Sequence, residues 1–331
     1  MKKYLTLILT ALMIVVLPVG CKKDNTEKVT QADTLKIVTT IFPEYDWVRQ
    51  IAGDNIEHTD IQLLLKNGVD LHSYQPNTKD LTAISEADIF IYVGGHSDTW
   101  VEDALKDPVN KERIVINLFD VLDGELKPMM ETEGMEHHHH EDHEDHDDHH
   151  HEDEYDEHVW LSLPRAVKAV DFIAEEMGKA DKDRAKDYRE NADKYIYELE
   201  SLDQEYRQVI DDGTINTLIF ADRFPFFYMT DDYGLYYYAA FSGCSADAEA
   251  SFETISILAN KIDELGLKHV LTIENRSHRI PETVIEHTKT GDQTILTLNS
   301  LQSVTEQDLK DGINYMDVMT DNLQILSEAL K

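Results

Sequence analysis

Residues 183–210 read DRAKDYRENADKYIYELESLDQEYRQVI, a stretch of 28 residues without glycine or proline. Its apolar side chains recur every three or four positions, which is the spacing of one face of an α-helix. Such a helix would be roughly 40 Å long at about 1.5 Å per residue, long enough to cross a whole domain. A coiled-coil segment is the alternative, but only this segment shows the pattern. The apolar stripe consists of Tyr188, Ala192, Tyr195, Leu199, Leu202, Tyr206 and Val209.

Strand-like and helix-like segments alternate on both sides of this helix. Such βα alternation is typical of mostly parallel sheets covered by helices. We therefore predict an α/β fold of two similar lobes, 34–182 and 213–331, joined by one long linking helix over 183–212. Ligands of open α/β sheets bind beyond the carboxyl ends of the strands, so we expect a site in the cleft between the lobes. The predicted strands are Leu35–Ile41, Ile56–Leu65, Ile89–Val93, Arg113–Leu118, Thr217–Phe220, Leu235–Phe241, His269–Ile273 and Thr294–Leu298.

Helices are predicted between most of these strands. The helix that Ser162 caps is expected to stop at Gly178, because glycine commonly ends helices. The predicted helices are Glu44–Ala52, Thr78–Ala87, Thr99–Leu105, Ser162–Met177, Pro225–Thr230, Ser251–Leu265, Pro281–Lys289 and Tyr315–Leu330.

The first 33 residues have the features of an export signal followed by a tether. Two lysines precede the apolar run Leu5–Leu17, which is too short for a transmembrane helix, and Gly20-Cys21 follows. This ending resembles a bacterial lipoprotein cleavage site. We therefore predict a signal peptide over 1–20, a lipid on Cys21 and a disordered tether over 21–33. The protein is then extracytoplasmic and lipid-anchored to the cell membrane; plain secretion is the alternative.

The chain is strongly acidic, with a formal net charge of −36, which argues against nucleic-acid binding and favours attraction of cations. Part of that charge lies in 131–157, where acidic residues alternate with nine histidines. Imidazole is a common ligand of transition metals, and carboxylates help to hold divalent ions. We predict that this tract collects ions for another site; sensing, gating or buffering are alternatives. Its histidines are His137, His138, His139, His140, His143, His146, His149, His150 and His151.

Two further histidines lie in loops where the cleft is expected. His72 lies in GVDLHSYQP (68–76), and His158 begins HVWLSLP (158–164). These stretches resemble the two signature loops of the zinc/manganese ABC-transporter solute-binding proteins. The resemblance covers nearly the whole chain after the signal peptide and includes the long helix. An acidic His-rich loop just before the second signature is similar to that of the zinc-specific members.

The resemblance implies a set of metal ligands. The family's two loop histidines correspond to His72 and His158, and its carboxylate after a strand corresponds to Glu274. The remaining family ligand is normally a histidine in a His-Asp-Ala-like segment, where this chain reads FADRFP (220–225). That histidine is absent, and Asp222 is the substitute that the segment offers.

Two other side chains remain open as ligands. His96 follows the third predicted strand behind two glycines that permit close approach, so it either binds the metal or supports the site. Cys244 has no partner for a disulfide if Cys21 carries lipid, and a small buried thiol is the expected role, with metal ligation as the alternative.

The resemblance implies a capture protein rather than an enzyme. We expect a monomer that binds Zn²⁺ as its transported substrate and delivers it to an ABC permease in the cytoplasmic membrane. Mn²⁺ is the alternative ion, since a site richer in carboxylates would tolerate it, and a metal-dependent surface adhesin is the alternative class. A zinc hydrolase needs an open coordination position and a nearby base, but no His-Glu-x-x-His helix or nucleophile elbow supports one.

Overall fold

The computed structural model describes residues 34–128, 130–136, 155–243, 249–274 and 276–331. Within those residues, none of the helices combines the length and the apolar character that a membrane span requires. The predicted signal peptide, the lipid on Cys21 and the tether lie outside the described residues. So do Cys244 and all nine histidines of the tract.

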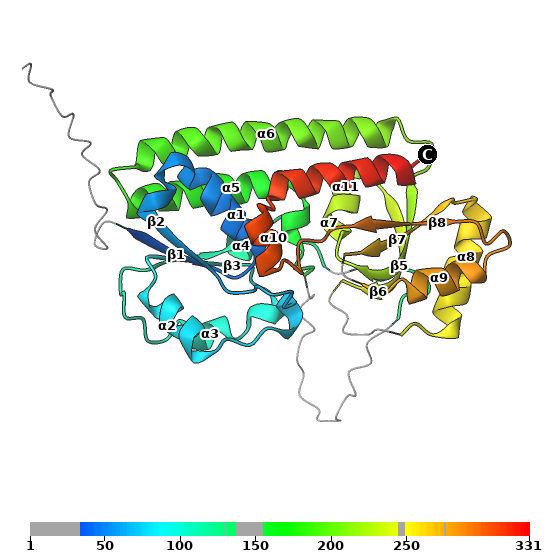
Figure 1. Cartoon of the computed structure of the whole chain (residues 1–331), viewed down its shortest axis with the longest axis horizontal. Helices are drawn as coiled ribbons and strands as arrows, with labels where there is room; N and C mark the ends of the chain where they lie inside the picture. The colour runs from blue at the N-terminus through cyan, green and yellow to red at the C-terminus, as the bar shows by residue number, and fades with distance from the viewer. Residues whose placement is uncertain (1–33, 129, 137–154, 244–248, 275) are drawn as a thin grey trace, which may run out of the picture.

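The N-terminal lobe is built on a four-stranded sheet in which all neighbouring strands are parallel. Its order is β2-β1-β3-β4, with β1 Leu35–Thr39, β2 Thr59–Leu63, β3 Ile89–Tyr92 and β4 Ile114–Asn117. Helices α1 and α5 lie on one side of the sheet, and α2 and α3 lie on the other (Figure 1). The helices of this lobe are α1 Phe42–Ala52, α2 Thr78–Glu86, α3 Val101–Ala104, α4 Leu118–Val121 and α5 Leu163–Ala180.

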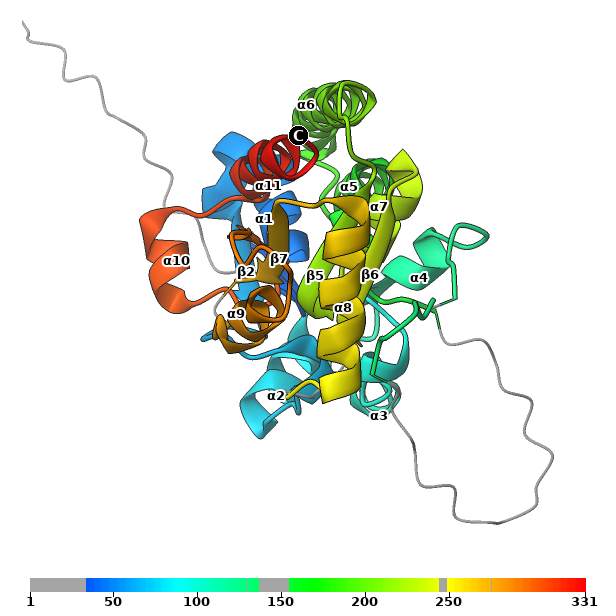
Figure 2. The same cartoon turned by 90° about the vertical axis from the view of Figure 1, so that its right-hand side faces the viewer.

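The C-terminal lobe repeats this plan with a second parallel sheet of order β6-β5-β7-β8. Helices α8 and α9 cover the face that points away from the other lobe (Figure 2). The strands are β5 Thr217–Phe224, β6 Tyr236–Ser242, β7 His269–Ile273 and β8 Thr294–Leu298. The helices are α7 Phe227–Tyr233, α8 Phe252–Leu265 and α9 Arg279–Glu286, whereas α10, Glu306–Asp311, lies beside α1 of the N-terminal lobe (Figure 1). The prediction of an α/β fold with two similar lobes is confirmed.

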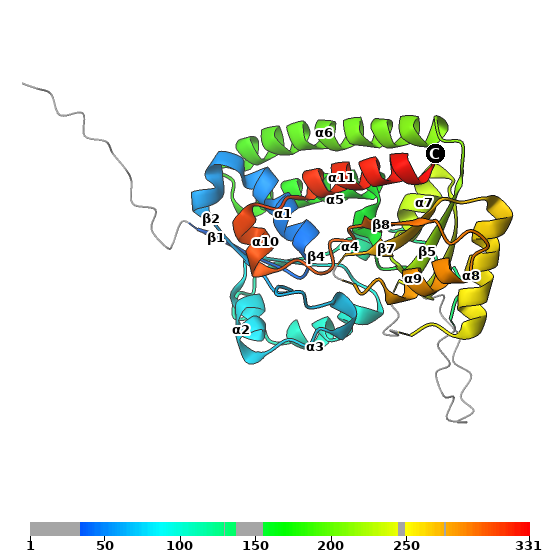
Figure 3. The ribbon, with the colours of Figure 1, turned by 45° about the vertical axis from the view of Figure 1, so that its right-hand side comes forward.

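The long linking helix is α6, Ala185–Asp211, and it runs along both lobes with α11, Tyr315–Ala329, beside it (Figure 3). Six of the seven stripe residues are buried, and Val209 is partly buried against the same core. The hydroxyl of Tyr206 on α6 donates to the carbonyl oxygen of Met319 on α11 at 2.6 Å. Two helices rather than one therefore bridge the lobes.

Helix α11 contacts the N-terminal lobe at its first residue and the C-terminal lobe near its middle. Its first residue, Tyr315, donates its N–H to Asp46 of α1 at 2.9 Å and packs edge-on against Trp47. Further along, Asn322 exchanges two hydrogen bonds of 2.8 Å with the backbone of Asn299, the residue after β8. Helix α11 therefore connects α1 of the N-terminal lobe to the end of β8 in the C-terminal lobe.

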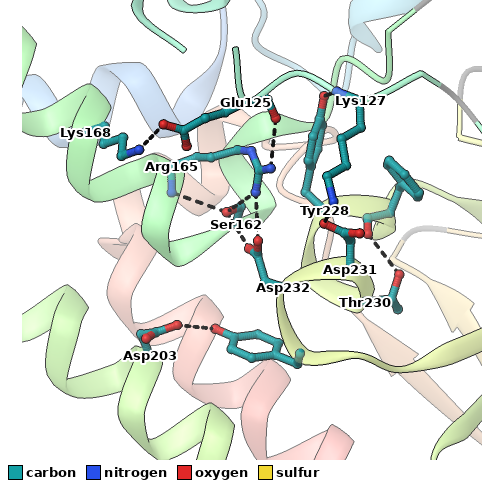
Figure 4. Close-up of polar contacts among 12 residues, drawn as sticks. Glu125, Lys127, Ser162, Arg165, Lys168, Asp203, Tyr228, Thr230, Asp231 and Asp232 are labelled. Carbon is teal, nitrogen blue, oxygen red and sulfur yellow. Dashed lines mark hydrogen bonds and ion pairs between the residues drawn. The ribbon is translucent and has the colours of Figure 1, made fainter. Parts of the chain in front are cut away.

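A buried ion pair joins the lobes close to the start of α5. Arg165 of α5 donates to the Asp232 carboxylate of α7 at 2.8 Å, and the Ser162 hydroxyl donates to the other oxygen of Asp232 at 2.5 Å (Figure 4). The guanidinium also donates to the Glu125 carbonyl oxygen and lies 4.3 Å from the centre of the Tyr228 ring. This cluster fixes α7 against α5.

Three local predictions are wrong. Helix α5 continues through Gly178, whose missing Cβ lets Ala185 of α6 approach; a Cβ at Gly178 would lie 3.2 Å from the Cβ of Ala185. Residues Gly53–His58 form a 3₁₀ turn rather than the start of a strand, because β1 begins opposite Thr59. Strand β5 extends to Phe224 through a register shift between Phe220 and Arg223.

The buried carboxyl of Glu44 makes the stability of the fold depend on pH. One of its oxygens accepts hydrogen bonds from the backbone of Thr40 and Ile41 and from the Thr40 hydroxyl, and the other has no partner among the described residues. Burial raises the pKa of Glu44 to about 8, and the neighbouring Asp98 adds to the rise. The folded state therefore binds this proton more tightly than the unfolded state.

We expect Glu44→Gln to stabilise the protein at alkaline pH. The raised pKa means that the Glu44 contribution is fully present below the unfolded value of 4.5 and is lost as the pH rises to about 8. The amide carries no charge, so its advantage should grow to the order of a few kcal/mol at pH about 8.5 and be small at pH about 5. Chemical unfolding at both values measures this difference, and an equal effect at both would contradict it.

Candidate metal centre

Two histidines from distant loops face each other between the lobes. His72 lies in the 3₁₀ turn η3, Leu71–Ser73, after β2, and His158 immediately precedes η5, Val159–Leu161. Their Nε2 atoms are 3.3 Å apart, His158 is fully buried, and the His72 side chain is 12% exposed. Nitrogens that each lie about 2.0–2.1 Å from a tetrahedral zinc ion are themselves roughly 3.3 Å apart. The pair has the spacing of two ligands of one ion.

The Nδ1 atoms of both rings face carboxylates. The Nδ1 of His158 lies 3.0 Å from Asp156 Oδ1, and the Nδ1 of His72 lies 3.1 Å from Glu157 Oε2 and 2.7 Å from Ser97 Oγ. The Ser97 hydroxyl donates to Glu157 Oε2 at 2.5 Å, so its oxygen is free to accept from His72. These acceptors favour a proton on the Nδ1 of each ring, and in that tautomer both Nε2 lone pairs are available to a cation. Without an ion, the 3.3 Å contact between the two Nε2 atoms is also within hydrogen-bonding distance if one of them carries the proton.

Electrostatics around Glu157 favour the charged form. Burial alone would raise the pKa of the Glu157 carboxyl, but hydrogen bonds from His72 and Ser97 outweigh burial and hold this pKa below its usual range. The carboxyl is therefore an anion beside the pair. Negative charge next to two open imidazole nitrogens favours a cation in the gap.

The backbone of each histidine is also held. Asp70 accepts the His72 N–H at 3.1 Å, and Asp156 accepts the His158 N–H at 2.9 Å. Arg223 of β5 donates to the second oxygen of Asp70 at 2.7 Å, which links the His72 loop to the other lobe. The pair is thus fixed from both lobes.

Glycines allow the surrounding loops to approach this closely. A Cβ at Gly243, directly after β6, would lie 2.6 Å from His158 Cε1, so the C-terminal lobe contacts the imidazole only because this residue is glycine. A Cβ at Gly95, where φ is +83°, would lie 2.5 Å from Glu157 Oε1. The predicted close approach behind His96 therefore occurs, but it brings Glu157 to Ser97.

The other predicted ligands do not join the pair. Glu274, after β7, accepts from the backbone N–H and the hydroxyl of Ser300, both at 2.8 Å. Asp222 is buried in β5, where it accepts from Arg223 N, Thr272 Oγ1 and Ile273 N. His96 is exposed at the start of the 3₁₀ turn η4, His96–Asp98.

Across the part of the chain that the structure describes, no three His, Cys, Asp or Glu side chains are grouped to hold an ion. Glu274 is nevertheless connected to the pair by a chain of contacts. The indole N–H of Trp160 donates to the Ser300 carbonyl oxygen at 2.9 Å, and the same indole packs edge-on against His158. A shift of the Ser300 loop would therefore displace Trp160, and through it the ring of His158.

Sequence reasoning missed the residues that hold the pair. Asp156 and Glu157 directly precede His158, but they lie at the end of an acidic run in which single carboxylates do not stand out. Ser97 was overlooked for a similar reason, because its neighbour His96 is the more obvious metal ligand. Only their position beside the two histidines could have drawn attention to them.

Comparison with known proteins identifies the family. The model of the family described as "ZnuA: Zinc-uptake complex component A periplasmic" matches residues 37–329. The chain is 34% identical over 328 residues to the "Zinc-binding lipoprotein AdcA" of Streptococcus pneumoniae strain R6, covering 99% of this chain and 61% of that protein. It is 30% identical over 323 residues to the "High-affinity zinc uptake system protein ZnuA" of Bacillus subtilis strain 168, covering 98% of this chain and 96% of that protein.

A solved structure agrees with this match. The Zn(II)-bound ZnuA-like domain of Streptococcus pneumoniae AdcA superposes with a TM-score of 0.70 at 30% identity, over 90% of this chain and 99% of that one. The chain spans 55% to 61% of the length of the streptococcal AdcA proteins. With a family model matched over almost the whole described chain, the protein belongs to the family of ZnuA, the periplasmic component A of zinc-uptake complexes.

Proposed function

We propose that this protein is the extracytoplasmic zinc-binding component of an ABC importer. It captures Zn²⁺ between its lobes and delivers the ion to a permease in the cytoplasmic membrane. The observation that carries the proposal is the 3.3 Å separation of the Nε2 atoms of His72 and His158, which suits two ligands of one tetrahedral ion. The zinc-binding relatives support the choice of ion, and the name lipoprotein of one relative supports a lipid on Cys21.

We propose Glu274 as the third ligand. Both hydrogen bonds of its carboxylate come from the single residue Ser300, so one loop movement releases it. Asp222 is a weaker candidate, since its carboxylate joins β5 to the end of β7 and its release would break that connection. His96 is exposed and lies next to Ser97, and it is our candidate for the fourth ligand.

The tract at 137–151 is proposed to collect ions for this site. Its imidazoles are weak ligands singly, but together they raise the local concentration of the ion. It ends seven residues before His158 in the sequence.

We expect one tight zinc site that does not depend on the tract. The chain without the lipid signal should bind one Zn²⁺ tightly and several more weakly, and deletion of 137–151 should remove only the weak sites. Calorimetry against a competing chelator measures both classes, with Mn²⁺ titrated as the control ion. Loss of the tight site on deletion would mean that the tract, and not the pair, is the primary site.

A growth experiment with a deletion strain distinguishes zinc transport from adhesion. A strain without this protein should grow poorly when zinc is depleted and recover when zinc, but not manganese, is supplied. Normal growth combined with a loss of attachment would instead support an adhesin.

A further inference from the structure

Two consecutive carboxylates serve two different imidazoles. Asp156 lies 3.0 Å from the Nδ1 of His158, and Glu157 lies 3.1 Å from the Nδ1 of His72. Glu157 also accepts the Ser97 hydroxyl, which turns the Ser97 oxygen, 2.7 Å from the same Nδ1, into an acceptor for His72. Both carboxylates are buried, with exposed fractions of 1% and 2%. The dipeptide therefore lies behind the pair, on the side opposite to the gap between the Nε2 atoms.

This dipeptide is itself held rigidly. The N–H of Asp156 donates to the Lys127 carbonyl oxygen at 3.1 Å, and the Tyr228 hydroxyl donates to the Asp156 carbonyl oxygen at 2.9 Å. Glu157 accepts from Ser97 N at 2.7 Å and from the Ser97 hydroxyl. Because these partners come from separate segments, the carboxylates are fixed before any ion arrives.

A fixed carboxylate decides which ring nitrogen carries the proton. A carboxylate only accepts hydrogen bonds, so it stabilises the tautomer with the proton on Nδ1. The opposite tautomer would point an Nδ1 lone pair at an anion and place an N–H in the gap. With both protons on Nδ1, in contrast, both Nε2 lone pairs are available to one cation at the 3.3 Å spacing.

We propose that Asp156 and Glu157 are positioning residues that hold both imidazoles in the Nδ1–H tautomer and keep their Nε2 atoms at ligand spacing before the ion binds. This deepens the proposed function and rests on it. The ion then meets ligands that need no reorientation, which lowers the ordering cost of binding. The two negative charges also offset part of the charge of the divalent ion.

The test uses Asp156→Asn and Glu157→Gln in the chain lacking 137–151, which removes nine of the sixteen histidines; His72→Ala and His158→Ala then assign the signals of the pair among those of the seven that remain. Side-chain ¹H–¹⁵N spectra of the zinc-free protein report the tautomer of each histidine. We expect Asp156→Asn to change the signals of His158 and Glu157→Gln to change those of His72. Zinc affinity should fall roughly 10- to 100-fold in each variant.

Matched controls are Asp123→Asn and Glu102→Gln, which remove exposed carboxylates from the same lobe. They should change neither spectra nor affinity. Unchanged tautomers and unchanged affinity in the test variants would overturn the proposal. If zinc leaves the His72 and His158 signals of the unsubstituted protein untouched, the proposed function fails instead, while the tautomer result still stands by itself.

Discussion

Replacing either His72 or His158 by alanine is expected to weaken zinc binding by about 10²- to 10³-fold. Zinc sites with four protein ligands bind with about 10–16 kcal/mol, so one ligand accounts for roughly 3–4 kcal/mol. The loss should be of this size because, among the described residues, no other metal-ligating side chain is grouped with the remaining imidazole. The double variant should lose the tight site, because the remaining candidate ligands are the carboxylates of Glu274 and Asp222 and the exposed imidazole of His96.

The measurement is a chelator-competition titration in the chain lacking 137–151. His278→Ala is the control, because that histidine is exposed on the C-terminal lobe. Circular dichroism checks that each variant folds. Survival of a tight site in the folded double variant would show that zinc binds elsewhere.

Replacing Arg165 by methionine is expected to destabilise the protein by about 3–5 kcal/mol at pH about 8. The substitution leaves the buried carboxylate of Asp232 without its cation, and losing one partner of a buried pair has this typical cost. The side chains of the pair are 6% and 11% exposed, so water cannot replace the guanidinium. Chemical unfolding of the zinc-free protein measures the change.

The same variant should be less destabilised at pH about 5. Burial already raises the pKa of Asp232, despite hydrogen bonds from Ser162 and attraction by Arg165. Without Arg165 this pKa rises further, so the carboxyl is neutral at low pH and its penalty appears as the pH increases. Arg279→Met is the control, because its ion pair with Glu249 is 78% and 81% exposed and should contribute little. Equal losses for both variants would contradict a special role of the cluster.

Elements with strong local patterns could be predicted from the sequence. Strands β7 and β8 have the predicted bounds, because runs rich in branched residues end at turns on both sides. The stripe of α6 is equally local, since every member is set by helical spacing. Gly178 misled the prediction, because glycine serves helix packing as well as helix ends.

The candidate site was only partly predictable. The loops of His72 and His158 were recognisable from their resemblance to a family, and their role as ligands stays a prediction. Contacts such as that between Arg223 and Asp70 join residues 153 positions apart, for which no local pattern exists. The hydrogen bonds from Ser300 to Glu274 likewise depend on β7 and β8 ending beside each other, which no local pattern in the sequence indicates.

The pairing of α6 with α11 has a mechanical consequence. A single rod between two bodies permits torsion about its own axis, whereas two rods side by side resist both torsion and bending. Because Tyr206 and Met319 join the rods and Tyr315 fixes one of them to α1, a rotation of one lobe would have to shear these bonds. We therefore expect the ion to enter and leave when short loops, such as those of His72 and Ser300, are displaced. A protein partner that binds these loops could then change the rate of ion release.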